Sequence, residues 1–194
     1  MSNRHPAGVL RRRRPALLVL PLLVMLFALV LGVTPAHADD YSMDQTDIDA
    51  TLDTSGGLTV TEVRTFDFSG DFHGVYWKIP KGRTVSVQVL DAGIVENGEA
   101  RSFAESSSGA NETYSITDGG SYLQVKLYSA QSDTTVQFYV SYFADGIATR
   151  WSDTGELYWK FVSDGWDVES QNVTCTIHLP VPSGESVAGG DNVR

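Results

Sequence analysis

Apolar and polar residues alternate along most of the chain between Ile48 and Leu179, which predicts β-strands with one face in a core and the other in water. The clearest runs lie at residues 85–89, 123–127 and 136–142. After residue 38, no segment of the sequence has a helical period of useful length. Many short strands with glycine-rich turns predict an all-β fold. We expect an antiparallel β-sandwich-like domain rather than a closed barrel.

Glycine-containing turns separate the expected strands. The turn sequences are Ser55-Gly56-Gly57, Asn97-Gly98 and Asp118-Gly119-Gly120. Each is typical of a tight connection between neighbouring antiparallel strands. The serine-rich residues 106–110 predict a surface loop. One short helical turn is expected near residues 152–158, because Ser152 is a suitable N-cap.

The strand expected at residues 58–68 carries a contradiction in its pattern, because its apolar face also contains Glu62 and Arg64. A β-bulge near Val63 would flip the register and is the simpler interpretation. In the alternative interpretation, both charges lie over the edge of the core. Glu62 is then a partly buried carboxylate with a raised pKa or a partner.

The first 38 residues predict export. Four arginines at residues 11–14 precede an apolar stretch at 15–33, and Ala36 and Ala38 form a small-residue cleavage site. We expect a secretory signal peptide over residues 1–38. An uncleaved anchor is the alternative, because the apolar stretch approaches the length needed to span a bilayer. In both cases the chain from residue 39 onward lies outside the cytoplasm.

The rest of the chain is strongly acidic. Residues 39–194 hold all 24 acidic residues but only nine of the 14 basic ones, which gives a net charge of −15. This charge argues against nucleic acid and anionic lipid as partners. The single cysteine, Cys175, excludes an intramolecular disulfide. Its place in an alternating run predicts that Cys175 is buried and that His178 faces solvent.

Two pairs of residues are candidates for a ligand site. Trp159 and Trp166 flank a short turn, and aromatic rings on a sandwich can stack on sugars, although they more often fill cores. The other pair is Glu62 and His73, which a hydrolase could use for acid–base chemistry. A packed, hydrogen-bonded histidine is the simpler interpretation of His73.

No metal, cofactor or catalytic residue is expected. The acidic series near residue 50 comprises Asp44, Asp47, Asp49 and Asp53. It lacks the glycine and the terminal glutamate of a calcium loop, and Asp47, Asp49 and Asp53 have the parity of a solvent-facing strand. The histidines lack the spacing of zinc ligands, and no nucleophile–base order is evident.

Three motifs support a resemblance to a known family. Residues 71–80 (DFHGVYWKIP) follow a strand reading LTVTEV, and residues 153–160 (DTGELYWK) and 165–168 (GWDV) come later. This order resembles the N-terminal ectodomain of predicted bacterial membrane proteins with a domain of unknown function, the DUF2207 family. The resemblance implies a signal peptide, a β-rich extracytoplasmic domain and then transmembrane helices, without catalytic residues.

These observations lead to one expected function with two alternatives. We expect residues 39–182 to form an extracytoplasmic interaction or scaffolding domain, and residues 183–194 to be an open, truncated end. The membrane anchor of the full-length protein would lie downstream of residue 194 and is missing here. The truncated chain alone would then be secreted. The expected partner is an envelope protein or a glycan, and not nucleic acid. The alternatives are a carbohydrate-binding module using Trp159 and Trp166, and a hydrolase using Glu62 and His73.

Overall fold

The computed structural model describes residues 39–82 and 86–181. The N-terminal arginines, the cleavage site at Ala36 and Ala38, and the expected open end at 183–194 lie outside these described residues. Ten strands and no helix occur in the described part of the chain, so the all-β prediction is confirmed. The strands are β1 (Asp40–Leu52), β2 (Leu58–Pro80), β3 (Ser86–Glu96), β4 (Glu99–Ser102), β5 (Ala104–Glu105), β6 (Thr113–Asp118), β7 (Tyr122–Asp145), β8 (Ala148–Arg150), β9 (Gly155–Leu157) and β10 (Val173–His178).

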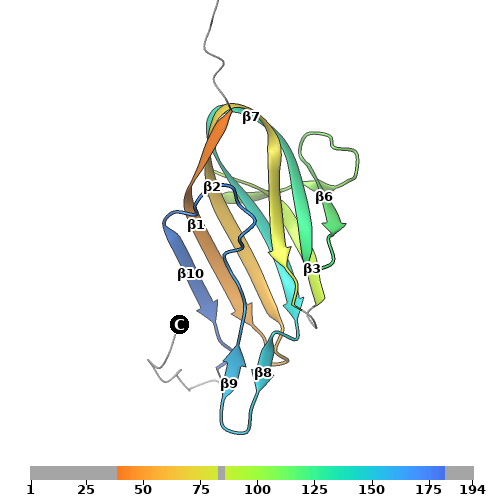
Figure 1. Ribbon diagram of the computed structural model, residues 1–194, viewed down its shortest axis with the longest axis vertical. Coiled ribbons are helices and arrows are strands. Elements are labelled where there is room, and N and C mark those ends of the chain that lie inside the picture. Colours follow the sequence, from red (N-terminus) through yellow and green to blue (C-terminus); the bar gives the residue numbers. More distant parts are fainter. Residues whose placement is uncertain (1–38, 83–85, 182–194) are drawn as a thin grey trace, which may run out of the picture. The chain divides into compact units, whose positions relative to one another are not determined.

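The two longest strands form the frame of the domain. β2 pairs with β7 in antiparallel orientation over its whole length, with register shifts between Phe68 and Gly74. The two-stranded ribbon bends back at these shifts (Figure 1). A side chain near the end of β2, Trp77, consequently hydrogen-bonds to Glu62 near its start, at 3.1 Å. The bend thus turns one hydrogen-bonded sheet into two facing layers, which is the expected sandwich-like arrangement.

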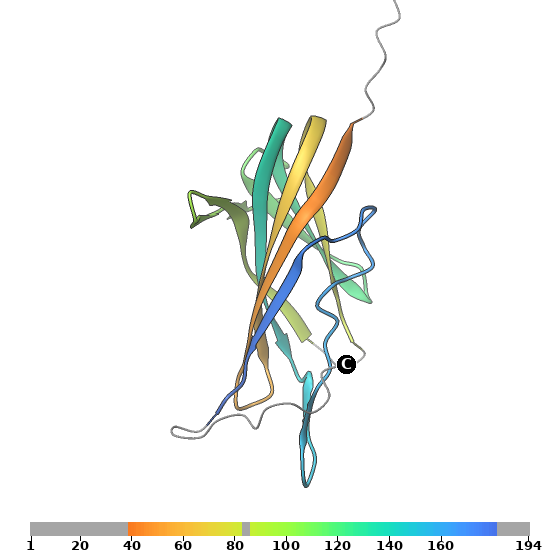
Figure 2. The ribbon, with the colours of Figure 1, turned by 90° about the vertical axis from the view of Figure 1, so that its left-hand side faces the viewer.

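The first layer has the strand order β10–β1–β2–β7–β3–β4, and β6 and β5 extend the other half of the ribbon. In Figure 2 the long strands β1, β2 and β7 run side by side. β10 lies parallel to β1, and β5 lies parallel to β6. The sheet is therefore mixed rather than purely antiparallel. β10 takes its place beside β1 after the irregular connection at residues 158–172, which follows β9.

The bend in β2 depends on Gly74. Its φ is 135°, and a Cβ at this position would collide with the backbone carbonyl of Leu127. Only glycine has both the required conformational freedom and the required lack of side chain. Gly74 therefore permits the close crossing of β2 and β7 where the layers separate.

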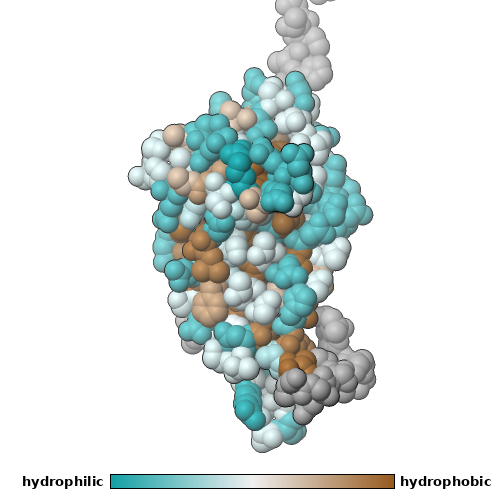
Figure 3. Space-filling view, turned by 180° about the vertical axis from the view of Figure 1, so that it is seen from behind, coloured by the Kyte–Doolittle hydropathy of each residue, from teal (hydrophilic) through white to brown (hydrophobic). Residues whose placement is uncertain are grey.

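The core lies between the two layers and is filled by alternating positions of the long strands, as their pattern predicts. The largest fully buried apolar side chains include Trp77, Tyr142, Phe66, Phe138, Met43 and Leu58. On the rear face of the molecule, hydrophobic side chains reach the surface in separate patches among hydrophilic ones (Figure 3).

The predicted turn at Asn97 and Gly98 is confirmed, since both have positive φ (54° and 82°) and join β3 to β4.

The helical turn expected near residues 152–158 is wrong. Residues 148–157 form the hairpin β8–β9, in which Ala148 pairs with Leu157. The Trp151 N–H donates to the Thr154 carbonyl at 2.8 Å and closes the connection. The backbone N–H and C=O groups that would form hydrogen bonds within a helix therefore pair across the hairpin instead.

Candidate functional site

Glu62 and Arg64 lie inside the core and form an ion pair. β2 pairs regularly with both neighbours around Val63, so the predicted bulge is wrong and the alternative, a buried carboxylate with a partner, is correct. The side chains of Glu62 and Arg64 are 5% and 1% exposed, and Arg64 Nη2 lies 2.8 Å from Glu62 Oε2. Trp77 Nε1 and the Tyr142 hydroxyl also donate to this carboxylate, at 3.1 and 3.0 Å. With Arg64 Nε, which donates to Glu62 Oε2 at 3.3 Å, four donor groups thus replace the water that burial removes from Glu62.

The Arg64 guanidinium also holds the connection between β9 and β10 against the sheet. Its central carbon lies 5.1 Å from the ring centroid of Trp77 and 4.8 Å from that of Trp166. Arg64 Nη1 donates to the Ser170 hydroxyl at 3.0 Å. Both Trp166 and Ser170 belong to the long connection. The buried charge therefore binds an irregular segment to the core through cation–π contacts and a charge-assisted hydrogen bond.

Trp159 and Trp166, the candidates for sugar stacking, both pack against the core while remaining partly exposed. Trp159 Nε1 donates to the Tyr142 hydroxyl at 3.1 Å. Burial, followed by the charge of Glu62, raises the pKa of this hydroxyl well above its usual value. Trp166 meets Trp77 edge-on at a centroid distance of 5.3 Å. The structure therefore brings both tryptophans to the Glu62–Arg64 cluster instead of a separate flat platform.

Trp166 borders an aromatic cavity of about 250 Å³. Tyr41, Phe72 and Asp167 also line this cavity. Burial, and then the nearby Asp167 carboxylate, raises the pKa of Tyr41. The Trp166 Nε1 atom is buried and has no hydrogen-bond partner among the described residues.

His73, the other half of the hydrolase pair, is exposed at the bend of β2. It lines a shallow cavity with Asp71 and Gln131. The Glu62 carboxylate is engaged by Arg64 and its other donors, and His73 is not among them. The two residues thus lie in different environments, one in the core and one in solvent.

The expected acidic series behaves as a solvent-facing strand and turn. Asp44, Asp49 and Asp53 are exposed. Hydrogen bonds from the Ser55 hydroxyl and the Gly57 N–H lower the pKa of Asp53, which organises the β1–β2 turn. Within residues 39–82 and 86–181, no group of three or more His, Cys, Asp or Glu side chains is placed to hold a metal ion.

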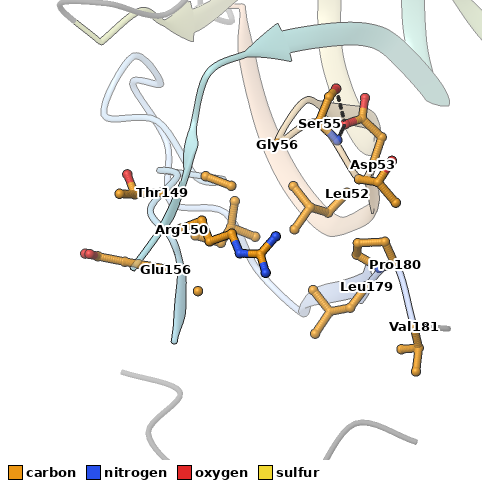
Figure 4. Close-up of a pocket in the computed structure, with 14 residues that line it drawn as sticks. Leu52, Asp53, Ser55, Gly56, Thr149, Arg150, Glu156, Leu179, Pro180 and Val181 are labelled. Atoms are coloured by element: carbon orange, nitrogen blue, oxygen red, sulfur yellow. Dashed lines mark hydrogen bonds between the residues drawn. The ribbon is translucent and has the colours of Figure 1, made fainter. Parts of the chain in front are cut away.

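An open cavity of about 500 Å³ lies where three segments meet at one end of the first layer (Figure 4). They are the β1–β2 turn, the β8–β9 hairpin and residues 179–181. Leu52 and Leu179 form part of the apolar wall of the cavity, and the Arg150 side chain extends across the cavity toward them. We call this cavity the apolar groove. It combines an apolar interior with a charged rim, as ligand and peptide sites do.

The edge strand β10 leads into the apolar groove, and all six of its residues are exposed. Cys175 is among them, so the prediction that it is buried is wrong. Its register partner in β1 is the buried residue Ile48, which shows that Cys175 does point toward the core side. It is exposed because β10 lies at the edge of the first layer, where the second layer does not cover it. His178 faces solvent as predicted, and its Nε2 lies 2.9 Å from an Asp49 carboxylate oxygen.

The motif order noted in the sequence has a direct match. The family model described as "Predicted membrane protein (DUF2207) N-terminal domain" matches residues 42–194. This chain belongs to the DUF2207 family. The match covers every strand described above except the first two residues of β1. Within the described residues of this DUF2207 domain, no helix is long and apolar enough to cross a membrane.

Other comparisons add only distant similarities. A putative protease from Parabacteroides distasonis aligns over 54% of this chain and 22% of its own, with 6% identity and a TM-score of 0.31. Leukotriene A4 hydrolase from Saccharomyces cerevisiae, with or without bestatin, aligns over 60% of this chain and 18% of its own, with 9% identity and a TM-score of 0.35. At these TM-scores the similarities carry no argument. A search of curated proteins found no match.

The open edge of the DUF2207 domain is the feature that the sequence interpretation missed. The run at residues 173–179 correctly predicted a strand with an apolar side. Alternation alone does not tell whether a strand is central or at an edge, because both kinds have one apolar side.

Proposed function

We propose that this chain is the extracytoplasmic interaction domain of a membrane-associated bacterial protein, and that its β10 edge binds an extended segment of a partner polypeptide. Membership of a family of predicted membrane proteins supports the membrane association. The arginines and apolar stretch of residues 11–33, together with the acidic composition of the remainder, support placement outside the cytoplasm.

Within residues 39–82 and 86–181, β10 carries none of the usual protection of a sheet edge, and this observation carries the proposal. Val173 is 45% exposed and Ile177 is 40% exposed, on the same side of the strand. Natural proteins usually block a free sheet edge with charges, prolines or very short strands. The six residues of β10 include no charged side chain other than an ionisable histidine, and no proline.

The opposite edge of the same layer follows the usual rule. β4 has only four residues, and two of them are Glu99 and Arg101. The Arg101 guanidinium forms ion pairs with Glu96 and Glu112 that cover this edge, at 2.9 Å each. The contrast between the two edges supports the proposal that β10 pairs with another strand, a mode of recognition called β-augmentation.

The apolar groove extends this surface beyond the end of β10. Leu179 and Val181 are 43% and 38% exposed, and both line the groove. An extended peptide that pairs with β10 would continue into it and bury apolar side chains there. Contiguous exposed apolar surface of this kind marks a protein interaction site in soluble domains.

Site-specific photo-crosslinking tests the proposal. The chain would carry a photoreactive amino acid at Val173 or Ile177 and be expressed in the source bacterium, and adducts would be identified by mass spectrometry. We expect a polypeptide adduct at both positions. Matched controls place the same amino acid at Gln124 of β7 or Ser107 in the surface loop, where we expect none. Absence of any polypeptide adduct at positions 173 and 177 would refute the proposal.

A glycan site at Trp166 is a second candidate, which the aromatic cavity beside this ring favours. Soluble cell-wall polysaccharides would then change the tryptophan fluorescence, and Asp167→Ala would weaken this effect. The absence of both a spectral change and heat of binding would exclude it. The hydrolase alternative gains no support, because the Glu62 carboxylate is fully engaged inside the core.

A further inference from the structure

We infer that the strand paired with β10 is β10 of a second copy of this chain, related by a two-fold axis through Cys175. This inference rests on the proposed function, because it names the partner of the same edge. In an antiparallel pair with this symmetry, Cys175 lies opposite its own equivalent. Val173 of each copy then lies opposite Ile177 of the other.

The chemistry of β10 is self-complementary about Cys175. The strand reads Val173-Thr174-Cys175-Thr176-Ile177, so each residue on one side of the cysteine has an equivalent on the other. The two-fold axis would pair valine with isoleucine on the inner side and threonine with threonine on the outer side. β-Branched pairs and threonine pairs are both favourable across antiparallel strands. A two-fold interface requires such self-complementarity, whereas a different partner would not.

The exposed apolar side chains of β10 point toward the core side and would cover one another in the dimer. Thr46, Ile48 and Ala50 of β1 are their register partners and are all buried. The inner side of β10 therefore continues the core face of the sheet into solvent. A second β10 would supply neighbours for Val173 and Ile177 that the second layer does not provide.

The acidic surface of the domain does not oppose this pairing. The carboxylates that act on Cys175 at the centre of β10 are Glu62, which is paired with Arg64, and Asp49 on β1, which lies one strand inward. Strands are spaced by about 4.8 Å, so the β1 strands of two copies would lie about 14 Å apart. This separation exceeds the Debye length of about 8 Å at physiological salt, and the repulsion is screened. A strand pair of six residues is a small interface, so we expect a weak, reversible dimer.

The single cysteine of the chain gives a direct test. The full chain in mild detergent would be treated with oxidised glutathione. Two Cys175 thiols would lose two protons and two electrons to form one disulfide, and the glutathione disulfide would become two glutathione thiols. We expect a covalent dimer on a non-reducing gel, which reductant reverses and Cys175→Ser abolishes. Recovery of only mixed disulfides with glutathione would contradict the inference.

A second pair of variants tests the register. In a Cys175→Ser background, Thr174→Cys and Thr176→Cys chains would be mixed. The proposed axis places residue 174 opposite residue 176 of the other copy, where the Cα distance is about 4.5–5.5 Å, against about 7–8 Å for diagonal neighbours. We therefore expect the mixed disulfide to form faster than either self-disulfide. Equal rates would refute the two-fold axis at Cys175.

Charge changes at the flanking positions provide the matched control. The double variant Val173→Lys/Ile177→Lys would place lysine opposite lysine and should slow Cys175 disulfide formation by about tenfold or more. The double variant Val173→Lys/Ile177→Glu would place lysine opposite glutamate and should restore it. Both substituted positions are partly exposed, so the monomer should tolerate them. Equal slowing in both variants would contradict the pairing.

The two proposals can fail separately. If photo-crosslinking at Val173 and Ile177 yields another polypeptide and the Cys175 tests yield no dimer, the inference fails and the proposed function stands. If neither experiment yields a polypeptide adduct, both fail. An adduct of the chain with itself supports both the proposed function and the two-fold pairing, if it is lost in Val173→Lys/Ile177→Lys and recovered in Val173→Lys/Ile177→Glu.

Discussion

Substitution of Glu62 by Gln is the sharpest test of the buried cluster. Glu62→Gln preserves the size of the side chain but removes the charge opposite Arg64. It also replaces one acceptor oxygen by an amide group, which can only donate. Arg64 would then be an uncompensated charge with 1% exposure, and the Trp77 Nε1 or the Tyr142 hydroxyl would lose its acceptor. Breaking a buried pair in this way costs about 3–5 kcal/mol of the free energy of unfolding.

Guanidinium-induced unfolding, followed by tryptophan fluorescence, measures this loss. In the double variant Glu62→Leu/Arg64→Met neither charge remains, and only neutral donors lack partners. We therefore expect it to be more stable than Glu62→Gln, because replacing a whole buried ion pair by apolar residues of similar volume is often neutral or stabilising, whereas removing one partner leaves a buried charge unpaired. Glu96→Gln is the control, because it breaks the exposed pair with Arg101 and should cause a far smaller loss. A loss below about 1 kcal/mol for Glu62→Gln, or a double variant no more stable than Glu62→Gln, would refute this reasoning.

Two further predictions concern the bend and the tyrosines. Gly74→Ala should lower the free energy of unfolding by about 3 kcal/mol or more, because it adds a collision with the Leu127 carbonyl to an unfavourable φ. Gly98→Ala is the control, because a Cβ at position 98 would meet no atom within 4 Å, and it should lower the free energy of unfolding by only about 1–2 kcal/mol. If thermal unfolding shows Gly98→Ala to be the more destabilising of the two variants, the role of Gly74 in the bend is contradicted. Burial, with a further contribution from Asp91, raises the pKa of Tyr139 from 10.0 to about 12. The unfolded chain therefore loses this proton first, and stability that is complete below pH 10 should fall between pH 10 and 12. Tyr139→Phe should flatten this fall, as measured by denaturant unfolding at each pH, and an unchanged slope would count against the assignment.

The strands and turns were predictable because their determinants are local. Alternation with period two places each side chain on one face of a strand whatever the strand pairs with. The positive φ at Asn97 and Gly98 is likewise a property of two adjacent residues. The predicted helical turn near residues 152–158 failed because local capping by Ser152 was outweighed by the pairing of β8 with β9.

The two charges on the core-facing side of β2 could not be placed correctly from the local sequence. Two charges on an apolar strand face suggested a bulge, because an unpaired charge in a core is costly. Their actual partners, Trp77 and Tyr142, lie 15 and 80 residues from Glu62 in the chain. The antiparallel pairing of β2 with β7 places Tyr142 beside Glu62, and the bend of the ribbon brings Trp77 to the same carboxylate. No spacing in the sequence encodes that meeting.

The sequence by itself determined the long strands and their turns, since these depend on neighbours in the chain, although it did not predict the β8–β9 hairpin. Its motifs also indicated the family. The tertiary structure alone decided which strand lies at the edge. Cys175, Val173 and Ile177 carry the pattern of a buried face, yet they are exposed, because no second layer lies over β10. Burial is a property of what packs above a face, and that depends on contacts between residues distant in sequence. β10 is a candidate docking edge because its apolar side chains have the pattern of a buried face but remain exposed.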